Sequence, residues 1–231
     1  MEDTPFSQVR VPAAPVKVIT PFSNDQVSAF LESIDTDTSG GYRDYAFFLT
    51  LLDTGLRLGE LTGLRLGDTR LEERTLRVQG KGGKERMVPF GKGVQRMLWH
   101  YITFVRPVPS LVRDDYLFLT ADGRQLSKNR VEDRMRKYGR QVGLTGVRCS
   151  PHTLRHTAAI NFLRNGGNVF SLQRLLGHSS LEMTRRYCDV ADVDVQKAHA
   201  TASPVDNLIR VTPSGAVARI SKGNLRTAIT R

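Results

Sequence analysis

Apolar positions recur at helical spacing along most of the chain. A first helix is predicted after Ser23, which can cap it together with Gln26. Val27, Phe30 and Ile34 then fall on one face. The same signals predict further helices through Tyr45, Phe48, Leu49 and Leu52 up to Gly55; through Glu60, Leu61 and Leu64; through Val94, Met97, Leu98, Tyr101 and Val105 up to Pro107; through Val131, Met135, Tyr138 and Val142 after Ser127; and over HTLRHTAAINFLRNGG, with Ser150 as cap and Pro151 as first residue.

Two short helices are predicted near the end of this periodic region. Asn168 can open the first of them, and Ser179 can open the second with Glu182 completing a capping box. Tyr187 is expected at the end of the second helix.

A different pattern interrupts the helices at TLRVQGKGGKERMVPF. Two stretches with β-branched residues flank a turn with Gly80, Gly82 and Gly83, which predicts a β-hairpin with lysines at its tip. Residues 116–119, YLFL, can add a third short strand. We therefore expect an α+β fold, mainly α, with one small three-stranded antiparallel sheet, an arrangement shared by many unrelated proteins.

The two ends of the chain lack this periodicity. Residues 1–20 contain Pro5, Pro12 and Pro15 and are expected to form an extended arm or linker. Residues 201–231 mix Pro, Ser, Gly and scattered basic residues, which is typical of a mobile basic tail. One main domain is expected between them, over residues 21–200.

The charge balance narrows the class of partner. The 231 residues include 34 Lys and Arg against 23 Asp and Glu, a net charge of +11 that favours a polyanion such as nucleic acid. A membrane surface is the weaker alternative, because no run of about 18 apolar residues and no separate basic amphipathic helix is present. The N-terminus has no apolar core of a signal peptide, so a cytoplasmic location is expected. Cys149 and Cys188 are expected to be packing residues.

Basic side chains supply the groups that metal-independent chemistry at a phosphodiester needs: cations that bind the phosphate, a general base and a proton donor. Arg57 and Arg155 can clamp the non-bridging oxygens, because a planar guanidinium donates two parallel hydrogen bonds to phosphate. His152 and Arg155 lie three apart on a predicted helix, so a base and a phosphate clamp share one face. Lys81, at the hairpin tip, can protonate a departing 5′ oxygen once its ammonium has lost some solvation.

A histidine and a tyrosine complete the set. His178, in LLGH, can hydrogen-bond the same phosphate, and Tyr187 follows after a turn and a short helix. A phenol with an ordinary pKa near ~10 needs cationic neighbours to attack at neutral pH. Tyr187 is therefore the candidate nucleophile.

These residues stand in motifs that resemble a known family. TGLRLGEL, QGKGGKERMVPF, HTLRHTAA and LLGHSSLEMTRRY follow the order and spacing of tyrosine recombinases of the integrase and Xer-like branch, over roughly residues 20–200. The resemblance implies the catalytic-domain (DNA breaking-rejoining) fold of that family. It assigns the family's catalytic positions to Arg57, Lys81, His152, Arg155, His178 and Tyr187. It also matches Glu60 to an acidic position that supports the arrangement of the active site.

The resemblance further implies a mechanism and partners. Tyr187 attacks a scissile phosphate of double-stranded DNA to give a 3′-phosphotyrosine and a free 5′ hydroxyl, and a 5′ hydroxyl of a partner strand reverses the step. Site-specific recombination, as integration or excision, then needs neither cofactor nor metal. Members of the family assemble as tetramers on DNA, with a segment after the nucleophile docking into a neighbour, here residues 192–200. We expect the free protein to be monomeric.

Family members usually carry a separate N-terminal helical domain that completes a clamp around DNA. About twenty residues precede the catalytic part here. We therefore expect weak DNA binding whose affinity falls steeply as salt rises.

Each residue taken alone has a less specific interpretation. Arg57 fits a surface arginine, His178 a satisfied histidine at a helix end, and Tyr187 a half-buried aromatic residue. His152 and His156 have a spacing seen in zinc sites, but the acid of the HExxH pattern and a third ligand are missing, and His156 better fits helix packing. The joint occurrence of the motifs favours the active site.

Two other classes of protein are compatible with these motifs. The first is a non-catalytic DNA-binding accessory factor of the same fold, which the complete set of active-site residues disfavours. The second is a type IB topoisomerase, which the short chain and the Xer-like motifs disfavour. The DNA target and the choice among integration, excision and chromosome-dimer resolution stay open.

Overall fold

The structure is a computed structural model that describes residues 20–80, 83, 85–191, 199–200, 203–205, 209–211 and 217–219. The chain divides into two compact units, Met1–Thr157 (unit 1) and Ala158–Arg231 (unit 2). The predicted arm lies almost wholly outside the described residues, as does most of the predicted tail.

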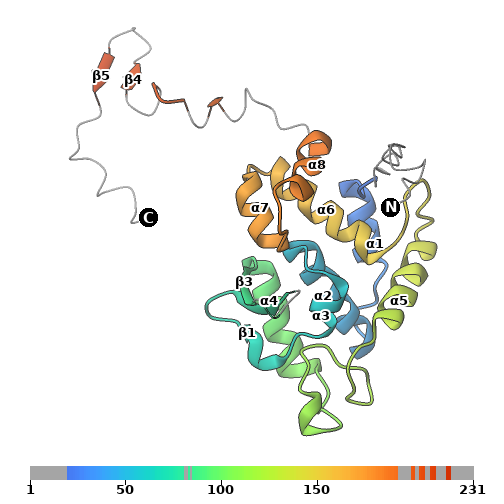
Figure 1. Ribbon diagram of the computed structural model, residues 1–231. Coiled ribbons are helices and arrows are strands. Elements are labelled where there is room, and N and C mark those ends of the chain that lie inside the picture. The colour runs from blue at the N-terminus through green and yellow to red at the C-terminus, as the bar shows by residue number, and fades with distance from the viewer. Residues whose placement is uncertain are drawn as a thin grey trace, which may run out of the picture. The chain divides into compact units, whose positions relative to one another are not determined.

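The first two helices begin and end where local signals predict. Ser23 caps α1 (Asn24–Glu32), because its hydroxyl accepts from the Gln26 N–H at 3.1 Å while the Gln26 side chain accepts from the Ser23 N–H at 3.0 Å. Helix α2 (Ser39–Thr54) ends at Gly55, whose φ of 61° is left-handed. Both predictions are confirmed. α2 packs against α1, α3 (Leu58–Thr62) and α4 (Lys92–His100) within unit 1 (Figure 1).

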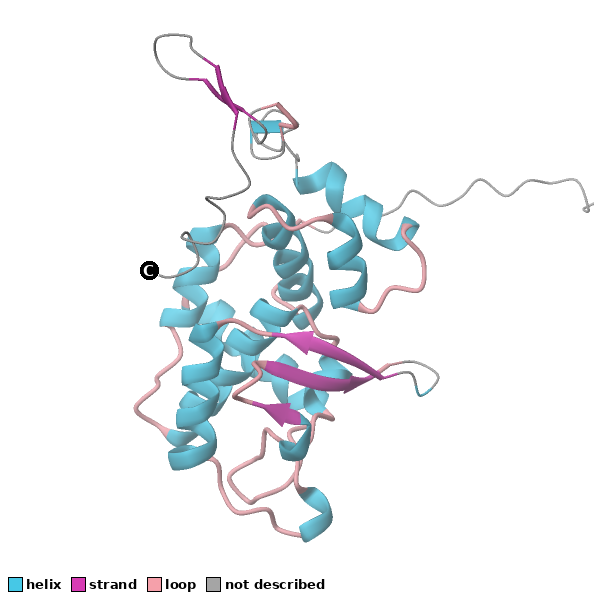
Figure 2. Ribbon diagram, turned by 90° about the vertical axis from the view of Figure 1, so that its left-hand side faces the viewer, coloured by secondary structure: helices cyan, strands magenta, loops and turns pink. Residues whose placement is uncertain are grey.

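The predicted hairpin is confirmed as part of a three-stranded antiparallel sheet. Strands β2 (Thr75–Gln79) and β3 (Glu85–Pro89) pair along their full length, and the sheet order is β1-β2-β3. Figure 2 shows the three strands side by side at one edge of the helices of unit 1. Lys81 and its neighbours Gly82 and Lys84 lie outside the described residues.

The third strand is not the predicted YLFL segment. It is β1 (Thr69–Arg70), which follows a 3-10 turn at Leu66–Asp68. Residues 116–119 make only two isolated bridges, one at each end of the segment. The prediction was wrong because Leu117, Phe118 and Leu119 are all buried in succession. Successive residues of a strand face opposite sides, so this segment needs cover on both sides, which the helical core provides.

The remaining helices of unit 1 also follow the apolar periodicity. The helix predicted up to Pro107 is α-helical only in its first part, α4 (Lys92–His100), and continues as a π-helix over Tyr101–Val105. Ser127 caps α5 (Lys128–Gln141), with its hydroxyl 3.3 Å from the Arg130 N–H. A 3-10 turn (Val112–Asp114) and helix α6 (Pro151–Arg164) complete the set of described helices up to residue 164.

Aromatic rings from three helices meet in the core of unit 1. Phe30, Phe48 and Tyr138 lie edge to face, with ring centroids 5.1 to 6.3 Å apart. A buried carboxylate lies beside them, because Asp44 accepts the Tyr138 hydroxyl at 2.8 Å. Arg43 donates to the other oxygen of Asp44 at 2.6 and 2.9 Å. These bonds compensate a charge that burial alone would strongly disfavour.

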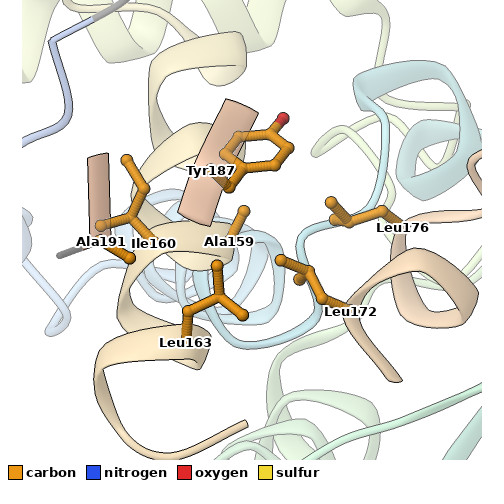
Figure 3. Close-up of a cluster of buried hydrophobic side chains, with 7 residues drawn as sticks. All are labelled: Ala159, Ile160, Leu163, Leu172, Leu176, Tyr187 and Ala191. Atoms are coloured by element: carbon orange, nitrogen blue, oxygen red, sulfur yellow. The ribbon is translucent and has the colours of Figure 1, made fainter. Parts of the chain in front are cut away.

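Unit 2 has a separate core around α7 (Val169–Leu176) and α8 (Glu182–Ala191), which are orange in Figure 1. Asn168 caps α7 as predicted, with its side chain 2.8 Å from the Ser171 N–H. The buried residues that form this core are shown in Figure 3: Ala159, Ile160, Leu163, Leu172, Leu176, Tyr187 and Ala191.

Helix α8 begins later than predicted. It starts at Glu182, and the Ser179 hydroxyl lies 3.7 Å from the sulfur of Met183, so the predicted capping box is wrong. The first turn forms instead on the carbonyl of Leu181, which accepts backbone N–H groups at 2.9 Å. Tyr187 consequently lies inside the helix and not at its end.

A short antiparallel pair, β4 (Ile209–Val211) and β5 (Val217–Arg219), lies in the segment predicted to be a mobile tail. The mobility of residues 201–231 stays a prediction.

Replacing Tyr138 by Phe should lower stability and remove one alkaline transition. Burial, followed by the nearby Asp44 charge, raises the pKa of Tyr138 from 10.0 to about 12. Because the folded protein holds this proton more tightly, the stabilisation is complete below pH 10 and is lost as pH rises towards 12. Tyr138→Phe should cost about 1.5–3 kcal/mol at neutral pH. Urea unfolding of both proteins at several pH values measures the two effects, and an identical alkaline loss in the variant contradicts the assignment.

Candidate active site

Arg57 stands at the start of α3, two residues after the left-handed glycine that ends α2. Its backbone N–H donates to Glu60 Oε2 at 2.9 Å, and its Nη1 donates to Oε1 at 3.0 Å. The Arg57 side chain is 42% exposed, whereas that of Glu60 is 8% exposed. The more deeply buried Glu60 therefore anchors Arg57 through these two hydrogen bonds, while the Arg57 guanidinium stays near the surface.

A second arginine, which the sequence did not single out, reaches the same carboxylate. Arg86 on β3 donates from Nη1 to Glu60 Oε1 at 3.0 Å and from Nη2 to Oε2 at 2.9 Å. Burial opposes ionisation of Glu60, but the hydrogen bonds from Arg86 and Arg57 outweigh it, so the pKa of Glu60 is lowered. The alternation of β3 was the available signal, because Arg86 shares a strand face with buried Val88.

Arg155 is buried, with 5% of its surface exposed, in the first half of α6. Its Nη1 donates to the carbonyl of Gly55 at 2.5 Å. Gly55 lies two residues before Arg57, so the Arg155 side chain contacts the segment that leads into Arg57.

His152 lies one turn before His156 on the same helix. His152 is exposed and His156 is buried. Their Nε2 atoms are 3.1 Å apart, so one ring must donate the proton that the other accepts. His156 therefore contacts the candidate base directly, which agrees with its predicted packing role and extends it.

Unit 2 brings together the other two candidates. His178 follows Gly177, a left-handed residue with φ 64° that ends α7. The rings of His178 and Tyr187 are stacked, with centroids 6.1 Å apart and planes within 12°. Arg186 lies over the Tyr187 ring, 5.4 Å from its centroid. An imidazole and a guanidinium therefore both lie against the Tyr187 ring.

Tyr187 also belongs to the hydrophobic core of unit 2, and it is 2% exposed. Figure 3 shows its ring beside Ala159, while its hydroxyl oxygen points away from Leu163 and Leu172. The packing fixes the ring and the hydroxyl lies outside the apolar cluster.

Thr184 is a further site residue that the sequence did not indicate. It is fully buried, and its Oγ1 is 2.9 Å from Nδ1 of His178. A signal was present, since Thr184 lies three residues before Tyr187 and so shares the apolar face of α8, where a hydroxyl needs a polar partner.

The predicted residues thus fall into two groups. Unit 1 holds Arg57, Glu60, His152 and Arg155, and unit 2 holds His178 and Tyr187. Lys81 lies between β2 and β3, outside the described residues.

In the part of the chain that the structure describes, no helix is long and apolar enough to cross a bilayer. No three side chains of His, Cys, Asp or Glu gather there as ligands for a metal ion, and His152 and His156 form a pair without a third member.

Comparison with known proteins identifies the class. The model of the phage integrase family matches residues 21–193, and the chain belongs to this family. The tyrosine recombinase XerD of Xanthomonas axonopodis pv. citri is 34% identical over 209 residues, which cover 87% of this chain and 68% of that protein. The tyrosine recombinase XerC of Chlamydia muridarum is 33% identical over 204 residues, 87% of this chain and 64% of that protein.

Solved structures agree with this family. The crystal structure of XerA recombinase superposes with a TM-score of 0.66 at 28% identity, over 84% of this chain and 67% of that one. The post-cleavage complex of XerH recombinase with its palindromic difH substrate gives a TM-score of 0.69 at 25% identity, over 85% of this chain and 56% of that one. The fold is thus that of tyrosine recombinase catalytic domains, as predicted. The chain spans roughly two thirds of the length of these curated relatives.

The Thr184 hydroxyl should stabilise unit 2 through His178. Thr184→Val keeps the shape of the side chain but removes the partner of a buried ring nitrogen, which should lower the free energy of unfolding by about 1–3 kcal/mol. Thr184→Ser keeps the hydroxyl and should recover most of this loss. Urea denaturation measures the stability, and ¹⁵N NMR of the imidazole reports the tautomer of His178. Equal stability of the Val variant and the wild type would show that the contact contributes nothing.

Proposed function

We propose that this chain carries out site-specific DNA recombination by metal-independent strand cleavage and religation through a 3′-phosphotyrosine. The observation that carries the proposal is the link between Arg155 and the carbonyl of Gly55. This bond supports the proposal because it brings the Arg155 side chain to the chain segment that leads into Arg57, although the two arginines are distant in sequence, and a guanidinium is suited to binding phosphate. Membership of the phage integrase family supports the same activity.

The proposed roles follow from the side chains. Arg57 and Arg155 bind the non-bridging oxygens of the scissile phosphate, and their fixed charges stabilise the transition state. His178 donates from Nε2 to the same phosphate, which assigns Nδ1 as the acceptor of the Thr184 hydroxyl. His152 acts as the base, and His156 fixes its ring.

Cleavage begins when the Tyr187 hydroxyl loses its proton and its oxygen attacks phosphorus. The P–O bond to the 5′ oxygen breaks, and Lys81 gives that oxygen a proton to leave a 5′ hydroxyl. Religation is the reverse reaction with the 5′ hydroxyl of a partner strand. One phosphoester is exchanged for another in each step, so the reaction needs no energy source.

Double-stranded DNA is the proposed substrate, in the cytoplasm. The net charge of +11 favours binding to its phosphates. XerH was solved with its difH substrate before and after cleavage, and a lambda integrase fragment was solved as a dimer on its core site. We propose that this chain assembles on DNA as a tetramer, with residues 192–200 docking into a neighbour; residues 192–198 lie outside the described part of the chain.

Tyr187→Phe should abolish the covalent DNA adduct without unfolding the protein. Phe keeps the ring that packs in the core of unit 2 and removes only the hydroxyl, which lies outside the apolar cluster. The assay mixes protein with nicked suicide duplexes, in EDTA, and looks for an adduct that survives denaturation. Tyr116→Phe is the matched control, because Tyr116 stacks on Arg65 in unit 1 and should leave the adduct unchanged.

Other outcomes of this assay discriminate the alternatives. Wild-type protein that binds DNA but forms no adduct is an accessory factor. Adducts on any sequence, with relaxation of supercoiled plasmid, indicate a topoisomerase. Sequencing of trapped fragments identifies the target of a recombinase.

The free protein should be a monomer that assembles only on DNA. Protomers held on a shared duplex have a high effective concentration, which favours contacts that are too weak to form between free protomers. Light scattering should therefore give about the monomer mass of 25.8 kDa without DNA and a tetramer with target DNA. A stable tetramer in the absence of DNA contradicts this expectation.

A further inference from the structure

Glu60 lies between two arginines that come from different parts of unit 1. Each carboxylate oxygen accepts two hydrogen bonds: Oε1 accepts from Nη1 of Arg57 and Nη1 of Arg86, both at 3.0 Å. Oε2 accepts from the backbone N–H of Arg57 and from Nη2 of Arg86, both at 2.9 Å. Arg86 thus makes the parallel, two-pronged contact, whereas the Arg57 side chain gives Glu60 a single bond.

The charges of this group explain why two arginines are useful. Arg57 paired with Glu60 alone is a neutral unit, and a neutral unit attracts phosphate weakly. Adding Arg86 gives the group a net charge of +1. The side chains are 16% exposed for Arg86, 8% for Glu60 and 42% for Arg57, so the positive charge that reaches solvent belongs to Arg57.

Removing Arg86 should pull Arg57 out of position. A carboxylate that is largely buried requires compensation. Glu60 forms ion pairs with Arg57 and Arg86, so within the described part of the chain Arg57 is the ion-pair partner that is left when Arg86 is removed. Two-pronged pairing is the most favourable arrangement of that guanidinium. That pairing directs Arg57 towards Glu60 and away from a phosphate.

The sheet register determines where Arg86 lies. β2 and β3 pair so that Arg86 is opposite Val78, and both share a face with buried Leu76 and Val88. The side chain therefore points towards the helices of unit 1, where α3 carries Glu60. The lowered pKa of Glu60 agrees with a carboxylate that stays charged between the two guanidinium groups.

We propose that Arg86 is a positioning residue for DNA cleavage: by holding both oxygens of Glu60, it keeps Arg57 directed at the scissile phosphate. This inference rests on the proposed function. It assigns Arg86 no contact with the DNA. It also couples the hairpin to Arg57, because β3 directly follows the turn that contains Lys81.

The test compares substitutions at Arg86 with a matched control on the same hairpin. Arg77 on β2 also pairs with a carboxylate, but on the exposed face of the sheet: its Nε donates to Asp68 Oδ1 at 2.9 Å, and its Nη2 lies 2.8 Å from the same oxygen. Arg86→Gln should slow single-turnover adduct formation on the order of 10- to 100-fold, because small misplacements of a positioning group have effects of this size. Arg77→Gln should stay near the wild-type rate.

Binding distinguishes positioning from direct contact. A residue that contacts phosphate changes the slope of log K against log salt by about 0.9 when its charge is removed. Because Arg57 binds phosphate and Arg86 does not, Arg57→Gln should change the slope by about 0.9, and adding Arg86→Gln to that variant should leave the slope as it is. A further change of about one in the slope overturns the proposal, as does a wild-type cleavage rate in Arg86→Gln alone.

Two further variants test the route through Glu60. If Arg86 acts through this carboxylate, Arg86→Gln should cost little more once Glu60→Gln is present, whereas additive losses overturn the proposal. Arg86→Lys keeps the charge without the planar fork, so an intermediate rate is expected. Should Arg86→Gln fail to fold, Arg86→Lys decides, and a wild-type rate in it overturns the proposal.

A readout independent of cleavage separates this inference from the proposed function. In ¹⁵N-arginine NMR, the Nε–H signal of Arg57 should move in Arg86→Gln and stay in place in Arg77→Gln. If the wild type forms no adduct, the proposed function fails, but the NMR result still shows whether Arg86 positions Arg57. An unmoved Arg57 signal overturns the role of Arg86.

Discussion

Arg155 carries a charge in the interior of unit 1, and its bond to the carbonyl of Gly55 decides how the candidate site is built. Gly55 is the cap residue that ends α2, so this carbonyl lies just past the helix, and the hydrogen bond to it offsets part of the cost of burying the guanidinium. Gly55 then turns the chain in a left-handed conformation, and Arg57 follows. The contact that stabilises one arginine therefore also sets the start of the segment that carries the other.

A carboxylate next to arginines that are proposed to bind phosphate needs an explanation, because its negative charge would repel phosphate. Glu60 lies beneath the surface and accepts four hydrogen bonds from Arg57 and Arg86. Its charge is thereby balanced locally, and its geometry restricts two long, flexible side chains that would otherwise occupy many rotamers. An acid in this position orients cations at a small electrostatic cost.

Tyr187 shows how one residue can satisfy packing and chemistry together. Its ring is part of a cluster from α6, α7 and α8, and the stacked His178 ring and the buried Thr184 hydroxyl lie beside it. Packing restricts the ring to few orientations, so the hydroxyl is placed before any substrate arrives. The interpretation of Tyr187 as a buried aromatic residue and its interpretation as the nucleophile are therefore compatible.

The sequence by itself determined the helix caps at Ser23, Gly55 and Asn168 and the β2–β3 hairpin, because caps, turns and apolar periodicity act between residues a few positions apart. The candidate residues came from motifs in the same chain, and Glu60 from the resemblance alone. Only the tertiary structure decided that residues 116–119 enter the core, that α8 starts at Glu182, and that Arg86 and Thr184 belong beside the candidate residues. Glu60 and Arg86 are 26 positions apart, and Arg155 and Gly55 are 100 apart. Such partners are selected by which faces meet when the chain packs, and no local pattern specifies that choice.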